Sequence, residues 1–238
     1  MEEKNKKIIK PLDEKHLPIK PLTLNEMQDN ADDRLDLITN EFKKGFERIM
    51  NYPKSVTFFG SARFTEDNPH YQKARTVGSK IVKEGFTIVT GGGPGIMEAG
   101  NRGAKEGGGA ERSVAFCIEL PEGQVVNPYA SDCTSFHYFF SRKVMLTFSA
   151  EAYVFFPGGF GTLDEFFELV TLIQTHKIPK VPIILVGDDY WGKVNFFIKE
   201  YLLDKYETID AEDMDIYTIT EDEDEIIEII KKAPARDE

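Results

Sequence analysis

The sequence predicts an α/β fold: a doubly wound, Rossmann-like parallel sheet with helices on both faces, in a single domain. Three observations predict it. From residue 55 onward, short apolar runs alternate with helical stretches, which favours parallel strands with helices on the sheet faces. The runs are almost continuously apolar, as strands buried on both faces are. Three of them end in glycine-rich turns, at Gly60, Gly91 and Gly158, so we expect these turns at the carboxyl edge of the sheet, where such folds bind ligands.

The N-terminal region divides into two parts. Residues 1–24 carry three prolines among Lys and Glu, which predicts a flexible, irregular arm. Residues 25–54 are predicted to form an N-terminal helix, because apolar residues recur there at three- and four-residue steps and Pro53 follows them. The apolar stripe of this helix comprises Leu35, Ile38, Phe42, Phe46 and Ile49.

Residues 55–238 make up the α/β domain, with an acidic C-terminal end. Gly85 is placed to end its first helix, and Pro94 is placed to begin the second. A less regular stretch is expected at 119–137. The expected elements in order are strand 55–59, a helix through 71–81, strand 86–90, a helix from Pro94 to Ala104, strand 113–118, helix 138–149, strand 152–156, helix 162–176, strand 181–186 and helix 191–203.

The net charge of −12 comes mostly from the C-terminal end. Residues 207–238 hold 13 acidic and 3 basic side chains, which leaves the rest of the chain close to neutral. The acidic run 221–225 indicates a solvated face and a helix start. The near-neutral body has no stripe of Lys and Arg, so we expect no nucleic-acid binding. A small anionic substrate remains possible, because backbone amides can hold a phosphate.

The cysteine count and the hydropathy pattern bear on location and on metals. Two cysteines, Cys117 and Cys133, fit a reducing cytosol. No apolar run is long enough to span a bilayer, and residues 1–10 lack the apolar core of a secretory signal, so we expect a cytoplasmic protein without membrane contact. No metal site is expected either, because four histidines show no zinc-like spacing to one another or to the cysteines: His16, His70, His137 and His176.

The first glycine-rich turn, Gly-Gly-Gly-Pro-Gly at 91–95, follows a strand and opens a helix. Its amides and the helix N-terminus could form an anion site. Ile96 stands where a dinucleotide fingerprint has its third glycine, and no Gly-Lys-Ser/Thr follows, so hydride transfer and P-loop hydrolysis both lose support. A tight turn that merely requires small residues is an equal alternative.

The second turn, Pro-Gly-Gly-Phe-Gly-Thr-Leu-Asp-Glu at 157–165, joins a strand to the next helix. Thr162 could cap that helix or offer its hydroxyl to a phosphate. Asp164 and Glu165 would then lie in the first turn, where acids complement the helix dipole. A carboxylate beside a phosphate-sized amide nest could instead bind ribose hydroxyls. Two glycine nests and a carboxylate therefore suggest a nucleoside monophosphate or a phosphosugar as ligand.

The two turns, together with Ser-Arg-Lys-Val-Met at 141–145, resemble the LONELY GUY (LOG) family. Its members are cytokinin-activating nucleoside 5′-monophosphate phosphoribohydrolases, long mislabelled as lysine decarboxylases. The resemblance covers about residues 55–203 and preserves the order and spacing of the motifs. The N-terminal arm and helix and the long acidic end resemble the longer bacterial branch of the family.

The resemblance implies an enzyme of the AMP nucleosidase type, with Arg142 and Glu165 as catalytic residues and no cofactor or metal. Asp164-Glu165 stands where many members have Glu-Glu. The resemblance also implies hydrolysis of AMP or a cytokinin riboside 5′-monophosphate by a homodimer or a higher homo-oligomer. The expected substrate-binding residues are Gly60, Ser61, Gly91, Gly92, Gly93, Lys143, Gly158, Gly159, Phe160, Gly161, Thr162, Leu163, Asp164 and Thr171.

The residues themselves agree with glycosidic chemistry, because cleavage of an N-glycosidic bond passes through a cationic sugar that carboxylates stabilise. Glu165 could bind ribose, stabilise that cation or orient water, and Arg142 could hold the phosphate, the ribose or the departing base. Two alternatives remain: a non-catalytic carrier of a nucleotide or of the molybdenum cofactor, and a pyridoxal-phosphate decarboxylase that uses Lys177. Apolar surface beyond the needs of one sheet face predicts an oligomer interface at Tyr138, Phe139, Phe140, Phe166, Leu169 and Ile173.

Overall fold

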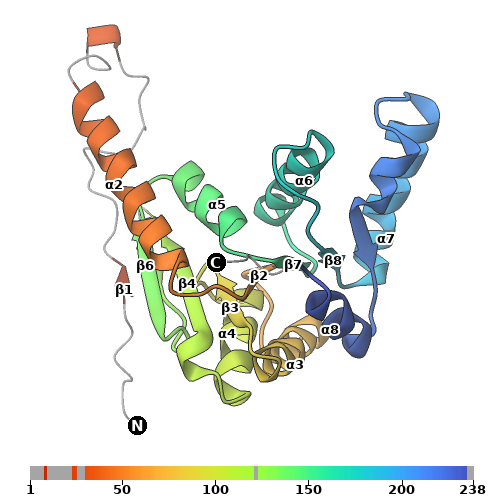
Figure 1. Cartoon of the computed structure of the whole chain (residues 1–238), viewed down its shortest axis with the longest axis horizontal. Helices are drawn as coiled ribbons and strands as arrows, with labels where there is room; N and C mark the ends of the chain where they lie inside the picture. Colours follow the sequence, from red (N-terminus) through yellow and green to blue (C-terminus); the bar gives the residue numbers. More distant parts are fainter. Residues whose placement is uncertain (1–7, 10–22, 26–29, 121–122, 235–238) are drawn as a thin grey trace.

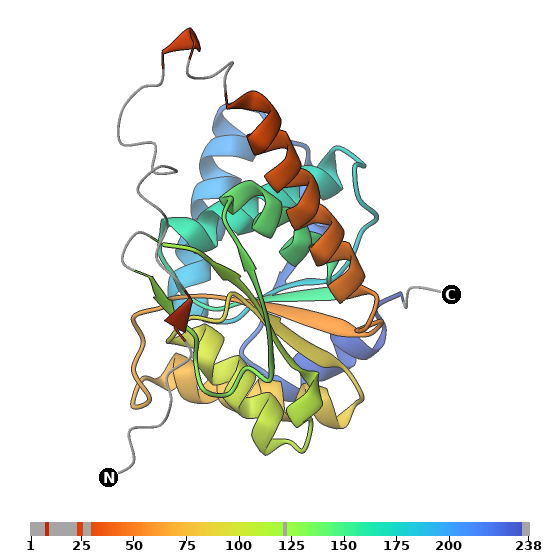
Figure 2. The same cartoon turned by 90° about the vertical axis from the view of Figure 1, so that its left-hand side faces the viewer.

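The computed structural model describes residues 8–9, 23–25, 30–120 and 123–234, and their centre is a seven-stranded sheet (Figures 1 and 2). Every strand pair in this sheet is parallel, in the order β6-β4-β3-β2-β7-β8-β9. The doubly wound parallel fold predicted from the sequence is therefore confirmed. The strands are β2 (Ser55–Phe59), β3 (Thr87–Thr90), β4 (Ser113–Ile118), β6 (Asp132–Phe136), β7 (Ala152–Phe155), β8 (Ile183–Leu185) and β9 (Tyr217–Ile219).

Helices cover both faces of the sheet (Figure 1). One apolar core lies between the sheet and α2, α5, α6 and α7, and it centres on Phe155, Phe166 and Trp191. The other core lies between the sheet and α3, α4 and α8. The helices are α2 (Ala31–Ile49), α3 (Pro69–Lys83), α4 (Ile96–Glu106), α5 (Phe139–Phe148), α6 (Phe160–Gln174), α7 (Asp188–Phe197) and α8 (Glu223–Lys231), with the π-helix η3 (Ile198–Lys205) continuing α7 and short 3₁₀ turns at η2 (Ala110–Arg112) and η4 (Ala211–Ile216).

The winding direction of the sheet reverses between β2 and β7. From β2 the chain moves outward through β3 and β4 to β6, and from β7 it moves the opposite way through β8 to β9. These two central strands are paired in parallel, with Phe59 opposite Phe155 at their carboxyl ends. Diverging connections leave a crevice at such a reversal, and that crevice is the usual ligand site of the fold.

Two strands of the sheet were not predicted. The stretch 119–137 was expected to be less regular, yet it contains β6 and the two-residue strand β5 (Gln124–Val125). β6 escaped because its sequence, Asp-Cys-Thr-Ser-Phe, is polar and only partly buried at the sheet edge. β9 has three residues and follows an acidic segment. Edge strands carry weaker apolar patterns because one side of their backbone lacks a sheet neighbour.

The N-terminal helix buries only part of its predicted apolar stripe: Ile49 is buried and Phe42 packs against the core. The described helix begins at Ala31, and its buried residues are Glu41, Gly45 and Ile49. Leu35 and Phe46 from the predicted stripe are instead 60% and 44% exposed. Most of the predicted arm, 1–24, lies outside the described residues; within it, Ile8–Ile9 form β1, antiparallel to β5.

Helix ends follow local sequence signals in most places. Gly85, at φ +89°, comes directly after the C-cap of α3, as expected. Pro94 precedes the N-cap Gly95 of α4, so it lies two residues before the first helical residue, Ile96, and does not begin the helix as predicted. Asp222 caps α8, and three acids occupy the first turn of that helix, which confirms the acidic run as a helix start. No helix in the described ranges is long and apolar enough to cross a membrane.

Candidate active site

A cavity of about 720 Å³ opens at the reversal point, at the carboxyl ends of β2, β3 and β7. Its size suits a ligand as large as a nucleotide. Ten of the predicted site residues line it, and they come from four separate segments of the chain. These ten are Gly60, Ser61, Gly91, Arg142, Gly158, Gly159, Phe160, Gly161, Thr162 and Glu165.

The three glycine-rich turns are bonded to one another around this cavity. The Ser61 amide donates to the Pro157 carbonyl at 3.0 Å, and the Ile96 amide donates to the Ser61 carbonyl at 3.0 Å. Gly95 has a φ of +70°, and a Cβ there would collide with the Ser61 carbonyl oxygen. The turn at Gly60-Ser61 therefore links the other two turns. Gly95 permits the close approach of its backbone to Ser61.

In the first glycine-rich turn, backbone groups form hydrogen bonds with other groups of the protein. The Gly92 amide donates to Thr90 Oγ1 at 3.0 Å. The carbonyls of Gly92 and Gly93 accept from the backbone N–H and side-chain Nδ2 of Asn127, at 2.9 and 3.2 Å. Both glycines are buried and neither lines the cavity. For these two positions the tight structural turn is the better description, and only Gly91 reaches the cavity.

The second glycine turn faces the cavity instead. α6 begins at Phe160 with Gly159 as its N-cap, so Thr162 is the third helical residue rather than the cap. A Cβ at Gly159 would meet no atom within 4 Å, and its φ of −94° is ordinary for any residue. The first amides of a helix lack intrahelical acceptors and favour an anion. The geometry of this turn is compatible with the anion site predicted from the sequence, and Gly159 lacks the positive φ typical of glycine nests.

Arg142 enters the cavity from the second turn of α5. Its Nε donates to the Phe116 carbonyl at 2.9 Å, at the end of β4. Its guanidinium lies against Gly91, where a Cβ would overlap it. Burial lowers the pKa of Arg142, and the nearby Glu165 carboxylate opposes that shift. Arg142 is thus a partly buried cavity residue and not an exposed helix cation.

Glu165 faces the same cavity from α6. Its Oε2 lies 4.0 Å from where a Cβ on Gly161 would stand. Burial raises the pKa of Glu165 to about 7, an effect that the Arg142 charge partly offsets. Because α6 starts at Phe160, no acid occupies its first turn, so the dipole explanation for Asp164 and Glu165 is wrong. A carboxylate that titrates near neutrality in a cavity is typical of a functional site.

Six predicted site residues lie away from this cavity, and their roles stay predictions. Lys143 forms ion pairs with Asp164 at 2.8 Å and Glu168 at 3.1 Å. The Thr171 hydroxyl donates to the Phe167 carbonyl at 2.7 Å on an exposed face of α6. A separate hollow of about 460 Å³ borders Asp164 and Thr171. The six are Gly92, Gly93, Lys143, Leu163, Asp164 and Thr171.

Several lining residues escaped the sequence analysis. Arg63 and Phe64 follow Gly60-Ser61 directly, and continuing that turn by a few residues could have found them. Tyr190 donates its hydroxyl to the Gly158 carbonyl at 2.9 Å, but it comes from α7 and carries no local signal. Lys177, the candidate for a Schiff base, is exposed just beyond α6 and does not line the cavity. The other unpredicted lining residues are Phe58, Phe59, Ala62, Met97, Phe139 and Pro157.

The chain is similar in sequence to several known proteins. A family model described as possible lysine decarboxylase matches residues 97–230, more than half of the chain. A cytokinin riboside 5′-monophosphate phosphoribohydrolase of Rhodococcoides fascians is 26% identical over 162 residues, covering 66% of this chain and 79% of that protein. A pyrimidine/purine nucleotide 5′-monophosphate nucleosidase of Escherichia coli K12 is 28% identical over 158 residues, which are 61% of this chain and 34% of that protein.

Solved structures share the fold. A molybdenum cofactor binding protein of Rippkaea orientalis aligns with a TM-score of 0.51 at 23% identity, covering 74% of this chain and 93% of that one. The molybdenum cofactor carrier protein of Chlamydomonas reinhardtii aligns with a TM-score of 0.54 at 21% identity, covering 76% of this chain and 97% of that one. The family match, the relatives and the motifs agree: the chain belongs to the family described as possible lysine decarboxylases, the LONELY GUY family of phosphoribohydrolases.

Proposed function

We propose that this protein hydrolyses the N-glycosidic bond of a nucleoside 5′-monophosphate, releasing the free base and ribose 5-phosphate. The observation that carries the proposal is the pair Arg142 and Glu165, which face one cavity beside the open N-terminus of α6. A pure binding protein has no need of a buried carboxylate that titrates near pH 7. AMP is the substrate we expect first, with a cytokinin riboside 5′-monophosphate as the related candidate.

Each part of the site has a place in this reaction. The amides at the start of α6 hold the phosphate. As the bond from ribose C1′ to the base nitrogen breaks, positive charge develops on the sugar, and the Glu165 carboxylate stabilises it. Water then adds to C1′, and its proton leaves with the base. Arg142 is placed to hold the ribose or the departing base, with its own position fixed by the Phe116 carbonyl.

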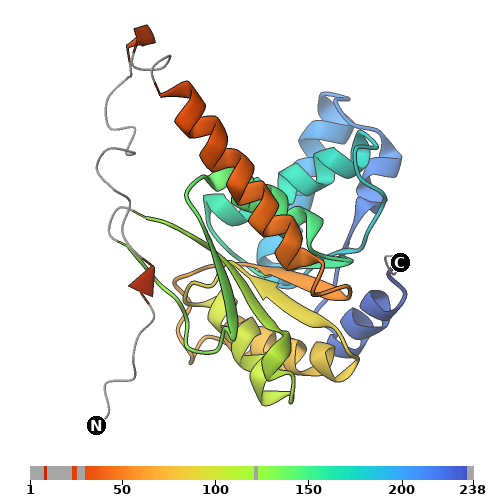
Figure 3. The same ribbon diagram turned by 60° about the vertical axis from the view of Figure 1, so that its left-hand side comes forward.

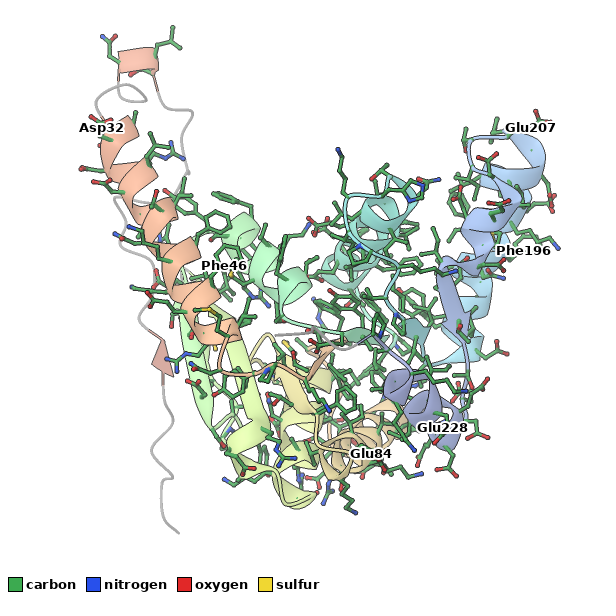
Figure 4. All side chains as sticks on the ribbon, viewed as in Figure 1. Asp32, Phe46, Glu84, Phe196, Glu207 and Glu228 are labelled. Carbon is green, nitrogen blue, oxygen red and sulfur yellow. The ribbon has the colours of Figure 1, made fainter. Side chains whose placement is uncertain are left out.

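The test is release of base from AMP and from isopentenyladenosine monophosphate, followed by chromatography. Glu165→Gln should lower turnover at least about 100-fold, as loss of a group that stabilises transition-state charge does, with a modest change in AMP affinity. Glu228→Gln, on α8 at the other face of the sheet, is the matched control and should keep full turnover (Figure 4). Folded wild-type protein that releases no base from any nucleoside monophosphate would refute the proposal.

A carrier function is the second candidate, because two solved neighbours are molybdenum cofactor binding or carrier proteins. Such a protein would bind its ligand in the same cavity without turning it over. Equilibrium binding of AMP together with a turnover assay separates the two functions. Tight ligand binding without base release, unchanged by Glu165→Gln, would favour the carrier.

We also propose that the chain assembles as a homodimer or a larger oligomer. Phe139 and Phe160, which line the cavity mouth, are 57% and 94% exposed, more than aromatic residues of a monomer usually are. Phe140 and Phe148 on α5 are exposed as well. The other part of the predicted interface is wrong, because three residues pack inside the chain against the sheet: Phe166, Leu169 and Ile173. Light scattering at micromolar concentration should report at least a dimer, and a monomer would contradict this.

A further inference from the structure

Glu41 is a buried acid on α2, where it lies beside the apolar contacts of Gly45 and Ile49. Its exposure is 4%, although glutamate is almost never fully buried without partners. Its carboxylate accepts hydrogen bonds from the backbone amides of His137 and Tyr138 and from the Ser141 hydroxyl, the Tyr138 contact measuring 3.4 Å. All three donors lie at the start of α5. A single side chain of α2 therefore holds the N-terminus of a helix that is almost one hundred residues away in the sequence.

This contact lies at the N-terminus of α5, a helix that has no side-chain cap of its own. Tyr138 is the N-cap residue of α5, and its side chain makes no capping bond. The first amides of a helix need acceptors, and a negative charge at that end is stabilised by the helix dipole. Glu41 places a carboxylate at that end and accepts from the N-cap amide of Tyr138. Ser141 adds a second link, because its hydroxyl bonds both Glu41 and the Tyr138 carbonyl, the latter at 2.9 Å.

The position of α2 is itself fixed by contacts on the C-terminal side of Glu41. Gly45, one turn after Glu41, packs so closely on Met145 of α5 that a Cβ would overlap the Met145 sulfur. Further along, Asp132 of β6 bonds Arg48 at 3.0 Å and the Tyr52 hydroxyl at 2.7 Å. Figure 3 shows α2 lying alongside α5 over the sheet. These contacts hold α2 against α5 and β6, and so they hold the Glu41 carboxylate at the start of α5.

Arg142 follows Ser141 directly, in the first part of the helix that Glu41 holds. Its backbone N–H donates to the Tyr138 carbonyl at 3.2 Å, which ties it to the capped turn. Its side chain must then pass between Gly91 and the Phe116 carbonyl. A shift of the α5 N-terminus would move the guanidinium away from both. We infer that Glu41 is a positioning residue that sets Arg142 for the proposed reaction, and this inference rests on the proposed function.

The test is a double-mutant cycle with Glu41→Gln and Arg142→Ala. Glutamine keeps the size of the side chain but turns an NH₂ group towards amides that need an acceptor. We expect Glu41→Gln to lower kcat for AMP by about 10- to 100-fold, since a displacement near 1 Å has effects of that order. KM should change much less. In the Arg142→Ala background the same substitution should have little further effect. Glu47→Gln, exposed on the same helix, is the control and should match wild type.

A purely structural role gives a different pattern. It would lower the melting temperature, and any loss of kcat would be equally large with and without Arg142, which would overturn the inference. If Glu41→Gln does not fold, Ser141→Ala removes one of the three contacts and should show a smaller loss with the same dependence on Arg142. If the wild type releases no base at all, the proposed function fails. The same cycle measured on AMP affinity by calorimetry then still decides whether Glu41 acts through Arg142.

Discussion

The two glycine-rich turns that flank the cavity look alike in sequence and differ in what their backbones contact. At Gly92 and Gly93 the chain is buried, and Asn127 and Thr90 occupy the polar groups of the turn. At Gly159 the chain borders open space at the beginning of a fifteen-residue helix. Both turns follow a parallel strand and precede a helix, so the sheet places them at the same edge.

The difference teaches that a glycine can be required for two opposite reasons. In the first turn, a Cβ at Gly92 would come within 2.5 Å of the Cys117 sulfur. Glycine is needed there because the Cys117 side chain packs directly against the backbone. In the second turn, a Cβ at Gly159 would touch nothing, so glycine is needed only if a ligand occupies that space. Substitutions in the first turn should therefore affect stability, and substitutions in the second should affect binding.

The largest effect is expected from Gly159→Val. The new side chain would cover the α6 amides and remove two or more hydrogen bonds to the phosphate, which at 1.5–3 kcal/mol each predicts an affinity loss of about 100- to 1,000-fold or more. Calorimetry with AMP measures this, and Gly159→Ala should fall between the variant and the wild type. The melting temperature should stay close to that of the wild type. Normal AMP affinity in a folded Gly159→Val protein would show that the phosphate does not bind at this turn.

Gly92→Ala should lower stability and leave AMP binding by the folded protein unchanged. The residue has a φ of +74°, and its Cβ would overlap Cys117, so backbone strain and overpacking together should cost about 2–4 kcal/mol in the free energy of unfolding. Urea denaturation measures the loss. Gly85→Ala is the matched control, because Gly85 has a φ of +89° and open space around it, so it should show the backbone cost alone, about 1–2 kcal/mol. Equal losses at both positions would contradict the packing argument.

A comparison of the affinities for AMP and adenosine tests whether the second turn binds the phosphate. A fixed set of amide donors rejects a ligand that leaves them unpaired, at about 1–3 kcal/mol per group. Wild-type protein should therefore bind AMP at least about 10-fold more tightly than adenosine. Gly159→Val should largely abolish that preference, whereas Gly92→Ala should keep it as long as the protein is folded. Equal affinity for AMP and adenosine in the wild type would remove the phosphate site.

The smallest effect is a pH-dependent stability difference at Glu165. Burial raises its pKa from 4.5 to about 7, so the folded protein holds this proton more tightly than the unfolded chain. The contribution of Glu165 to stability therefore declines as pH rises from about 4.5 to 7, and the full cost remains above 7. Glu165→Gln should be more stable than wild type at pH 8 by about 1–3 kcal/mol. At pH 4.5 most of that gain should disappear. A gain that is the same at both pH values would contradict the burial of this charge.

How well sequence predicted structure depended on how local the signal was. The strand and turn at 152–158 were predicted because a buried parallel strand is continuously apolar and a turn needs glycine. β6 was missed because its pairing with β4 is determined by the rest of the sheet and not by its own polar residues. α2 was predicted as a helix with Ile49 in its apolar stripe, but the burial of Glu41 and Gly45 was not predicted. The choice of Glu41 as a buried residue depends on donors in α5.

The sequence by itself determined the fold class, the turns at Gly60, Gly91 and Gly158, and the identity of Arg142 and Glu165 as candidate residues. Local periodicity and turn chemistry are enough for the fold class and the turns, because these depend on neighbours within a few positions. Arg142 and Glu165 were identified from the resemblance of their motifs to the LONELY GUY family. Only the tertiary structure decided which turn is open, that Arg142 and Glu165 share one cavity, and that α2 holds the helix carrying Arg142. Those features depend on which groups from distant segments occupy the same space, and that follows only once the whole sheet and its helices are packed.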